Sequence, residues 1–332
     1  MAKAQKTINN QECAASRVLL LGNGIHRAFN GEKESWNNLL NDFVNHLVLE
    51  KHIPFFCFPS DKVSASLRMS YIIAKIKERD ISNFPLILKK FLGQRYQCPK
   101  YTSQVQKIQD FVWNHYSVVL TTNIDKRIEP TGTKWESQSK KKRKYSTFRR
   151  KTDSKDTDKI IFYIHGCLDK EQSICLDLNH YLGEAKCAYE LLYPQTDYDN
   201  KKVKYVQALY SGDSHNCDFT SWLAYIFFKD VDIIGQALSD EEVDIWWALS
   251  KRDEYYNIRK ANIKSKKKSK ENVEINTIRY FYASCDNSEA LKDRLLLLRA
   301  LHVEPVIIMC NTYQEFYEKF FNDYAPKIKQ TK

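Results

Sequence analysis

The chain of 332 residues is 43% hydrophobic, which is enough to bury a large core and excludes a disordered protein. It has no apolar run of the ~18 residues that a membrane span needs, and Met1–Cys13 shows no signal-peptide pattern, so we expect a cytoplasmic protein with no membrane partner. The net charge of +11 is typical of nucleic-acid-binding proteins, yet removing the eight cations of Lys140–Lys151 and the seven of Arg259–Lys270 leaves −4.

The positive charge is therefore expected in two loops, about 131–158 and 259–272, on a mildly acidic globular body. Solvated loop tips are the simpler interpretation of these loops, and contact with nucleic acid or with an acidic protein partner is the alternative. The nine cysteines form no Cys-x-x-Cys pair, which predicts reduced, mostly buried thiols and no zinc site built on such pairs.

The first predicted unit follows a short N-terminal arm, residues 1–17. Val18–Leu21 is a buried strand, Gly22-Asn23-Gly24 is a glycine turn, and an apolar-periodic helix with Leu39, Phe43 and Leu47 follows as the crossover. Glycines at such a turn let backbone N–H groups approach a phosphate. Two glycines without a third leave a nucleotide-phosphate site and an ordinary strand-to-helix turn as open alternatives.

Further along the chain, segment 55–115 has helical periodicity and is predicted to be an insertion that forms a lid or an oligomer surface. Two apolar runs come next, Ser117–Thr121 and Ile160–Ile164, and each ends in polar residues. Val231–Ile234 is another predicted strand, and the Ser239–Glu242 capping box predicts a helix directly after it.

Two more strands, Ile278–Ala283 and Val303–Met309, each precede a helical segment. Strands that alternate with helices predict an α/β fold, with a doubly wound, mostly parallel, Rossmann-like sheet in one domain over 18–325. In such a sheet ligands bind at the carboxyl ends of the strands. Polar or glycine clusters follow four of these strands, and parallel strands bring all four to one edge of the sheet: Gly22–Gly24, Thr121–Asp125, His165-Gly166 and Gly235–Ser239.

The order of these clusters resembles the Sir2 superfamily. Thr121-Thr-Asn-Ile-Asp125 is similar to the sirtuin Thr-Gln-Asn-Ile-Asp motif, with Thr122 in place of Gln, and His165-Gly166 is similar to the sirtuin His-Gly. Three further features resemble bacterial SIR2-like proteins: Gly-Asn-Gly followed by Ser35-Trp36, the run Ser173–Tyr181, and the run Ile234–Asp240 before a helix. The resemblance covers residues 18 to about 310.

Two departures affect what the resemblance implies. The chain has no Cys-x-x-Cys zinc module, which sirtuin deacylases carry, and it lacks the Pro-Asp-Phe-Arg run over the cofactor, although Arg27 is nearby. The resemblance therefore implies an enzyme that hydrolyses NAD+ itself, needs no metal, and acts in prokaryotic abortive anti-phage defence.

The resemblance also implies the site residues. His165 is expected to be the catalytic base, Asn123 to position the ribose hydroxyls and the attacking water, and Asp125 to bind the nicotinamide carboxamide. The expected phosphate and cofactor contacts are Gly22, Asn23, Gly24, Arg27, Thr122, Gly235 and Gln236. As alternatives from the residues themselves, His165 could be a core histidine, and Asn123 and Asp125 could cap a turn.

Control of such an activity implies a partner. We expect a separate sensor or activator protein, such as a HerA-type ATPase, a nucleotide-sensing subunit or a short Argonaute, and a homo-oligomer. Two alternative functions stay open, a sirtuin-type NAD-dependent protein deacylase and a non-catalytic module that binds ADP-ribose or another nucleotide.

Overall fold

The structure is a computed structural model. It describes residues 17–30, 35–50, 58–60, 62–77, 84–95, 103–130, 133–135, 145–152, 159–193, 208–209, 217, 219–265, 275–286 and 288–325. The predicted arm 1–17 lies outside these residues except for Arg17, as do the lysine-rich runs at 140–144 and 266–270.

The described residues form one eight-stranded sheet with the order β3-β4-β5-β2-β1-β6-β7-β8. The strands are β1 (Val18–Leu21), β2 (Val118–Thr121), β3 (Lys134–Trp135), β4 (Arg150–Thr152), β5 (Ile160–Tyr163), β6 (Val231–Ile234), β7 (Ile278–Ala283) and β8 (Val303–Ile308). The six strands from β5 to β8 in this order run parallel, whereas β4 is antiparallel to β5 and β3 is antiparallel to β4. The prediction of a mostly parallel α/β sheet is confirmed.

Numbered by their order in the chain, the six parallel strands are arranged 3-2-1-4-5-6. This is the strand order of a Rossmann-like sheet, in which the order reverses beside the first strand. Here the reversal falls between β1 and β6, whose carboxyl ends carry Gly22 and Gly235. A ligand site is expected at that edge.

Helices cover both faces of the sheet. Side chains alternate along each strand, so each central strand contributes to an apolar core on either face. In β1, Val18 and Leu20 belong to one apolar core, and Leu19 and Leu21 belong to the other. The first core packs against α6 (Leu178–Leu192), α8 (Trp222–Phe228), α9 (Val243–Ser265) and α10 (Glu289–Ala300). The second packs against α1 (Gly24–Asn30), α5 (Ser103–Trp113), α11 (Tyr313–Lys319) and the short helix η4 (Phe320–Tyr324).

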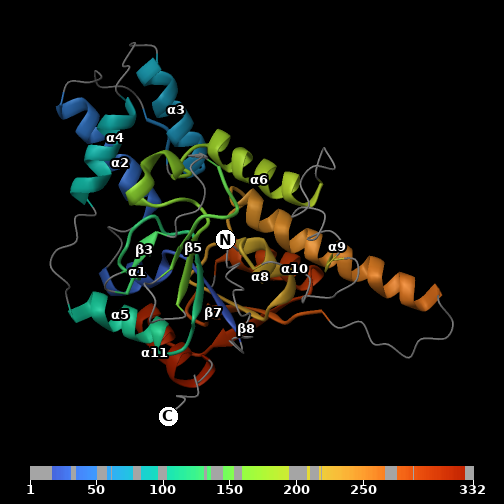
Figure 1. Ribbon diagram of the computed structural model, residues 1–332. Helices are drawn as coiled ribbons and strands as arrows, with labels where there is room; N and C mark the ends of the chain where they lie inside the picture. Colours follow the sequence, from blue (N-terminus) through green and yellow to red (C-terminus); the bar gives the residue numbers. More distant parts are fainter. Residues whose placement is uncertain are drawn as a thin grey trace, which may run out of the picture.

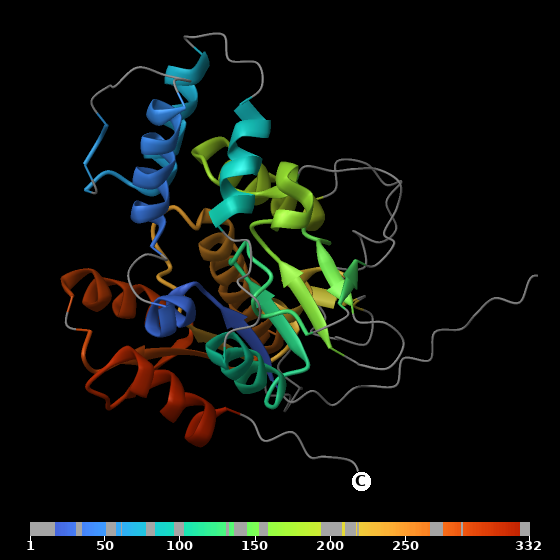
Figure 2. The ribbon, with the colours of Figure 1, turned by 90° about the vertical axis from the view of Figure 1, so that its left-hand side faces the viewer.

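A third apolar core lies in a helical group beyond one end of the sheet (Figures 1 and 2). We call this group the cap; it consists of α2 (Trp36–Leu49), α3 (Ala65–Lys77) and α4 (Phe84–Arg95). Ser35 caps the start of α2, where its side chain accepts a hydrogen bond from the backbone N–H of Asn38. The apolar face of α2 packs against the other two helices. The cap also packs on Ile124, Ile174 and Leu176, which follow β2 and β5, so it covers the carboxyl edge of the sheet.

The first unit of the fold differs from the prediction. The helix that directly follows the glycine turn is the seven-residue α1, and α2 belongs to the cap instead of crossing the sheet. The helix on the sheet face before β2 is α5, which contributes Ile108 and Val112 to the second core. Segment 55–115 therefore supplies helices both to the cap and to the face of the sheet.

Part of each predicted basic loop has regular secondary structure. Arg149 and Lys151 flank and form β4 and are buried, because Arg149 pairs with Glu184 and Lys151 pairs with Glu129 and Asp169. Helix α9 continues to Ser265, into the second basic stretch. Within the described part of the chain, no helix is both long and apolar enough to cross a membrane.

Candidate functional site at the carboxyl edge of the sheet

Asn123 and His165 occupy equivalent positions after neighbouring strands. The β2–β5 register ends with Thr121 opposite Tyr163, and each site residue comes two positions later. The backbone holds this alignment beyond the strands, since Ile164 N donates to Thr121 O at 2.8 Å and Leu168 N donates to Ile124 O at 2.9 Å. The structure thus brings the amide and the imidazole to the same edge of the sheet.

The glycine turn after β1 packs tightly against the segment after β6. Gly22 N donates to Ile234 O at 3.0 Å and Gly24 N donates to Gly235 O at 2.9 Å. A Cβ on Gly22 would lie 2.3 Å from Gly235 O, and Gly235 itself has a φ of +65°. Both positions therefore require glycine, one for close approach and the other for its left-handed backbone.

Side-chain hydrogen bonds connect the residues after β2 to the segment between β6 and α9. Thr122 Oγ1 donates to Gln236 Oε1 at 2.9 Å, and Gln236 Nε2 donates to Glu242 Oε1. Glu242 also accepts the backbone N–H of Ser239 at 3.0 Å, which is the glutamate half of the predicted capping box, although α9 begins only at Val243. The ends of β2 and β6 are consequently linked through one chain of polar groups.

His165 meets a carboxylate that the sequence analysis did not single out. Its Nε2 lies 3.2 Å and 3.3 Å from the two oxygens of Asp244, in the first turn of α9, and Tyr181 of α6 packs edge-on against the ring with centroids 5.0 Å apart. Burial disfavours the charged imidazolium, but the nearby carboxylates outweigh burial and raise the pKa of His165. The largest of these contributions comes from Asp244, followed by Glu242.

Two further buried carboxyl groups complete the cluster. Burial raises the pKa of Glu242 to about 7, against the opposing effect of His165. Burial likewise raises the pKa of Glu184 to about 7, although Arg149 pairs with it. Both groups can therefore change protonation near neutral pH, as acid–base residues of active sites commonly do.

Asn123 is buried and makes a single side-chain hydrogen bond among the described residues. Its Nδ2 donates to Gly22 O at 3.3 Å, whereas its Oδ1 has no hydrogen-bond partner there. Leaving a buried amide oxygen unsatisfied costs roughly 1–3 kcal/mol. A water or a ligand hydroxyl at this position would recover that free energy.

Asp125, in contrast, is engaged within the protein. Its carboxylate accepts from the backbone and the guanidinium of Arg127, both at 2.9 Å, and lies 3.7 Å from His26 Nε2. Burial raises its pKa, but His26 and Arg127 outweigh burial and hold the pKa of Asp125 well below its usual value. Asp125 is thus ionised and anchors the turn after β2.

The remaining predicted residues lie around the glycine turn. The carbonyl of Asn23 accepts the N–H groups of His26 and Arg27 at the start of α1. Arg27 is exposed, and its charge acts on Tyr313 and Tyr317 of α11. These contacts place Arg27 at the α1–α11 side of the turn.

Sequence reasoning missed Asp244, Glu242, Glu184 and Arg149 as members of the site. The sequence pattern identifies Glu242 only as a helix cap. Asp244 carried one usable signal, because an aspartate in the first turn of the helix after Gly235 is close to a strand end in the chain. Arg149 and Glu184 are brought in by β4 and α6, and their positions in the sequence gave no such signal.

The cap closes over this cluster. His165, Asn123 and Gln236 are each at most 5% exposed. Ser66 of α3 donates its backbone N–H to Glu241 Oε2 at 2.9 Å, which ties the cap to the segment after β6.

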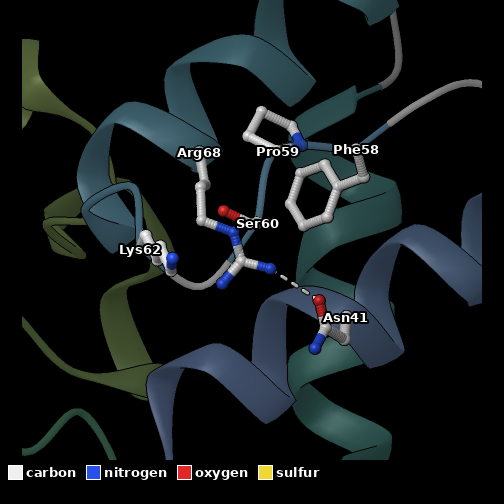
Figure 3. A pocket seen from close by; sticks show the side chains of 6 residues that line it. All are labelled: Asn41, Phe58, Pro59, Ser60, Lys62 and Arg68. Atoms are coloured by element: carbon white, nitrogen blue, oxygen red, sulfur yellow. Dashed lines mark hydrogen bonds between the residues drawn. The ribbon is translucent and has the colours of Figure 1, made fainter.

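An open hollow lies instead within the cap (Figure 3). Its lining includes Phe58, whose ring stacks 4.5 Å from Arg68 Cζ, and Asn41, which accepts from Arg68 Nη2 at 2.6 Å. None of the predicted site residues lines this hollow.

In the described part of the chain, no three His, Cys, Asp or Glu side chains are grouped so that they could hold a metal ion. The fold and the site together define an α/β protein with a mostly parallel, Rossmann-like sheet and a buried acid–base cluster at its carboxyl edge. The sequence matches no protein-family model, and the search of curated proteins gave no match.

Proposed function

We propose that the carboxyl edge is the active site of an NAD+ glycohydrolase of the SIR2-like kind, which releases ADP-ribose and nicotinamide. The observation that carries the proposal is the unsatisfied Oδ1 of Asn123, a buried acceptor at the same level of the sheet as His165. It is suited to a water molecule or a ribose hydroxyl. The 3-2-1-4-5-6 strand order supports the proposal, because dinucleotides bind at the point where that order reverses.

The reaction would use these groups as follows. The bond between ribose C1′ and the nicotinamide nitrogen breaks through an oxocarbenium-like state, and the bond electrons leave with neutral nicotinamide. Asn123 Oδ1 accepts a hydrogen bond from the attacking water, whose oxygen bonds to C1′. His165 takes the proton that the water loses, which requires its imidazole to be neutral.

The closed site requires an opening step. The cap packs on Ile124, and Ser66 of the cap donates a hydrogen bond to Glu241, so a dinucleotide enters only when the cap and the segment after β6 move apart. Gly22–Gly24, Thr122, Gly235 and Gln236 would then contact the phosphates and ribose.

A closed resting state fits an effector that is harmless until it is activated. Activation by a separate sensor protein or by self-assembly is part of this proposal, as is a role in anti-phage defence. The sensor would act by holding the cap open.

The test is hydrolysis of the fluorogenic substrate etheno-NAD+ by the full chain, alone and with the product of the neighbouring gene. We expect turnover that His165→Ala and Asn123→Ala each reduce by about 10²-fold or more. His302→Asn is the matched control, because His302 is an exposed imidazole before β8 and Asn tolerates its φ of 53°. Full turnover by His165→Ala, or none by any assembly, would contradict the proposal.

Two other outcomes identify the alternatives. Release of O-acetyl-ADP-ribose from an acetylated peptide would indicate a protein deacylase. Binding of ADP-ribose without turnover would indicate a sensor module.

A further inference from the structure

We propose that Asp244 is the positioning residue of His165, holding the ring with Nε2–H toward its carboxylate and leaving Nδ1 as the proton acceptor. The inference rests on the proposed function for the role of His165 as a base, but its structural content can be measured without any turnover. It assigns a role to a residue outside the motifs that the sequence analysis singled out.

The geometry of the pair carries the proposal. Both oxygens of Asp244 lie within 3.3 Å of His165 Nε2, and the ring and the carboxylate are both almost fully buried. An ionised carboxylate only accepts hydrogen bonds, so the facing nitrogen must carry the proton. Within the described residues Nδ1 has no hydrogen-bond partner, and in the neutral ring it is therefore the basic nitrogen.

The other carboxylates near His165 are already committed elsewhere. Glu242 accepts from Gln236 and from the backbone of Ser239, and Glu184 is paired with Arg149. They act on His165 through space, whereas Asp244 makes the hydrogen bonds. Tyr181 packs against the ring and limits its rotation.

This arrangement gives Asp244 two effects on proton transfer. It selects the neutral tautomer with a basic Nδ1, and it stabilises the imidazolium that forms once His165 has accepted a proton. An asparagine at position 244 removes the second effect and can favour the wrong tautomer by donating its own N–H to Nε2.

The experiment is ¹⁵N NMR of the full chain labelled at histidine, with the His165 signals assigned by their loss in His165→Gln. In the native chain we expect the Nε2–H tautomer at a pH above the pKa of His165. In Asp244→Asn we expect that pKa to fall by about one unit or more. Glu242→Gln should lower the pKa less and keep the tautomer, since Glu242 acts only through space.

Asp240→Asn is the matched control, because Asp240 is exposed in the same segment and should change neither quantity. An Nδ1–H tautomer in the native chain, or an unmoved His165 pKa in folded Asp244→Asn, overturns the proposal. If Asp244→Asn does not fold, as judged by its melting curve, the tautomer of His165 in the native chain alone tests the proposal.

Kinetics provide a second readout. Where the chain hydrolyses etheno-NAD+, Asp244→Asn should lower kcat by about 10²-fold or more and move the acid limb of kcat/KM to lower pH. A purely structural role would lower activity without moving that limb. If NMR shows the expected tautomer and pKa shift but the chain does not hydrolyse NAD+, the role of Asp244 toward His165 stands and only the proposed function is overturned.

Discussion

Asp232 and Asp244 are both completely buried aspartates of neighbouring elements, but they have partners of different chemistry. Asp232, near the amino end of β6, accepts from Arg17 and Arg279, each at 2.8 Å, and from Tyr116 at 2.8 Å. Asp244, at the carboxyl edge, is hydrogen-bonded to His165. A guanidinium stays charged at every pH that a protein tolerates, whereas an imidazole gains and loses its charge near neutrality.

The difference separates a structural site from a chemical one. At the amino edge the buried charge is fixed and balanced, and its hydrogen bonds join Arg17, β6 and β7 permanently. At the carboxyl edge three carboxyl groups surround one histidine, so the charge of the cluster varies with protonation. Substitutions at the two ends of β6 should accordingly affect different properties.

The largest effect on stability is expected for Asp232→Asn. It leaves the paired charges of Arg17 and Arg279 without their common carboxylate, and breaking a buried ion pair in this way costs about 3–5 kcal/mol. Urea unfolding measures the loss. Asp230→Asn is the control, because Asp230 also pairs with Arg17 but is partly exposed, and it should cost less than about 1 kcal/mol. Equal losses in the two variants would refute the assignment of Asp232 as the central anchor.

Gly235→Ala examines the carboxyl end of the same strand. The new Cβ would lie 2.4 Å from the hydroxyl of Tyr317 on a backbone with a φ of +65°, and the two effects together should cost about 2–3 kcal/mol. Tyr317→Phe removes the hydroxyl in contact, so the double variant should regain about 1 kcal/mol while keeping the backbone strain. If thermal melting shows no recovery in the double variant, that contact is not the cause.

A gradual effect on stability is expected from pH. The folded pKa values of His165, Glu184 and Glu242 are all raised, so between their unfolded and folded values the folded chain binds more protons than the unfolded chain. The free energy of unfolding should therefore decrease as pH rises from about 5 to 8, by about 2 kcal/mol or more. Glu184→Gln should flatten this decrease, and Asp230→Asn should not. A stability that increases over this range would contradict the assignment of the buried cluster.

Local sequence patterns predicted much of the sheet. Val18–Leu21, Val118–Thr121 and Val231–Ile234 are short, mostly apolar runs buried on both faces, with Thr121 and Asp232 as their polar members, and polar or glycine residues follow each of them. Such runs identify central parallel strands because the sheet is covered by helices on both sides. The same reasoning brought Asn123, His165 and Gln236 to one edge, where the structure places them.

The periodicity of a helix did not reveal what that helix covers. The apolar face of Leu39, Phe43 and Leu47 is buried as predicted, but it packs within the cap and not on the sheet. An amphipathic pattern specifies that a face is buried and leaves its partner undetermined. The buried Arg149 and Lys151 show the same limit for charge, since their acidic partners Glu184 and Glu129 are distant in sequence.

The sequence by itself determined the alternation of strands and helices and the residues at the strand ends. Short-range sterics and hydrophobic periodicity fix these features, and both are written in consecutive residues. Only the tertiary structure decided the strand order, the closure of the edge by the cap and the pairing of His165 with Asp244, 79 residues apart. Such long-range contacts form only when the whole chain packs, because they depend on the shapes and charges of segments that are distant in sequence. No local pattern specifies them.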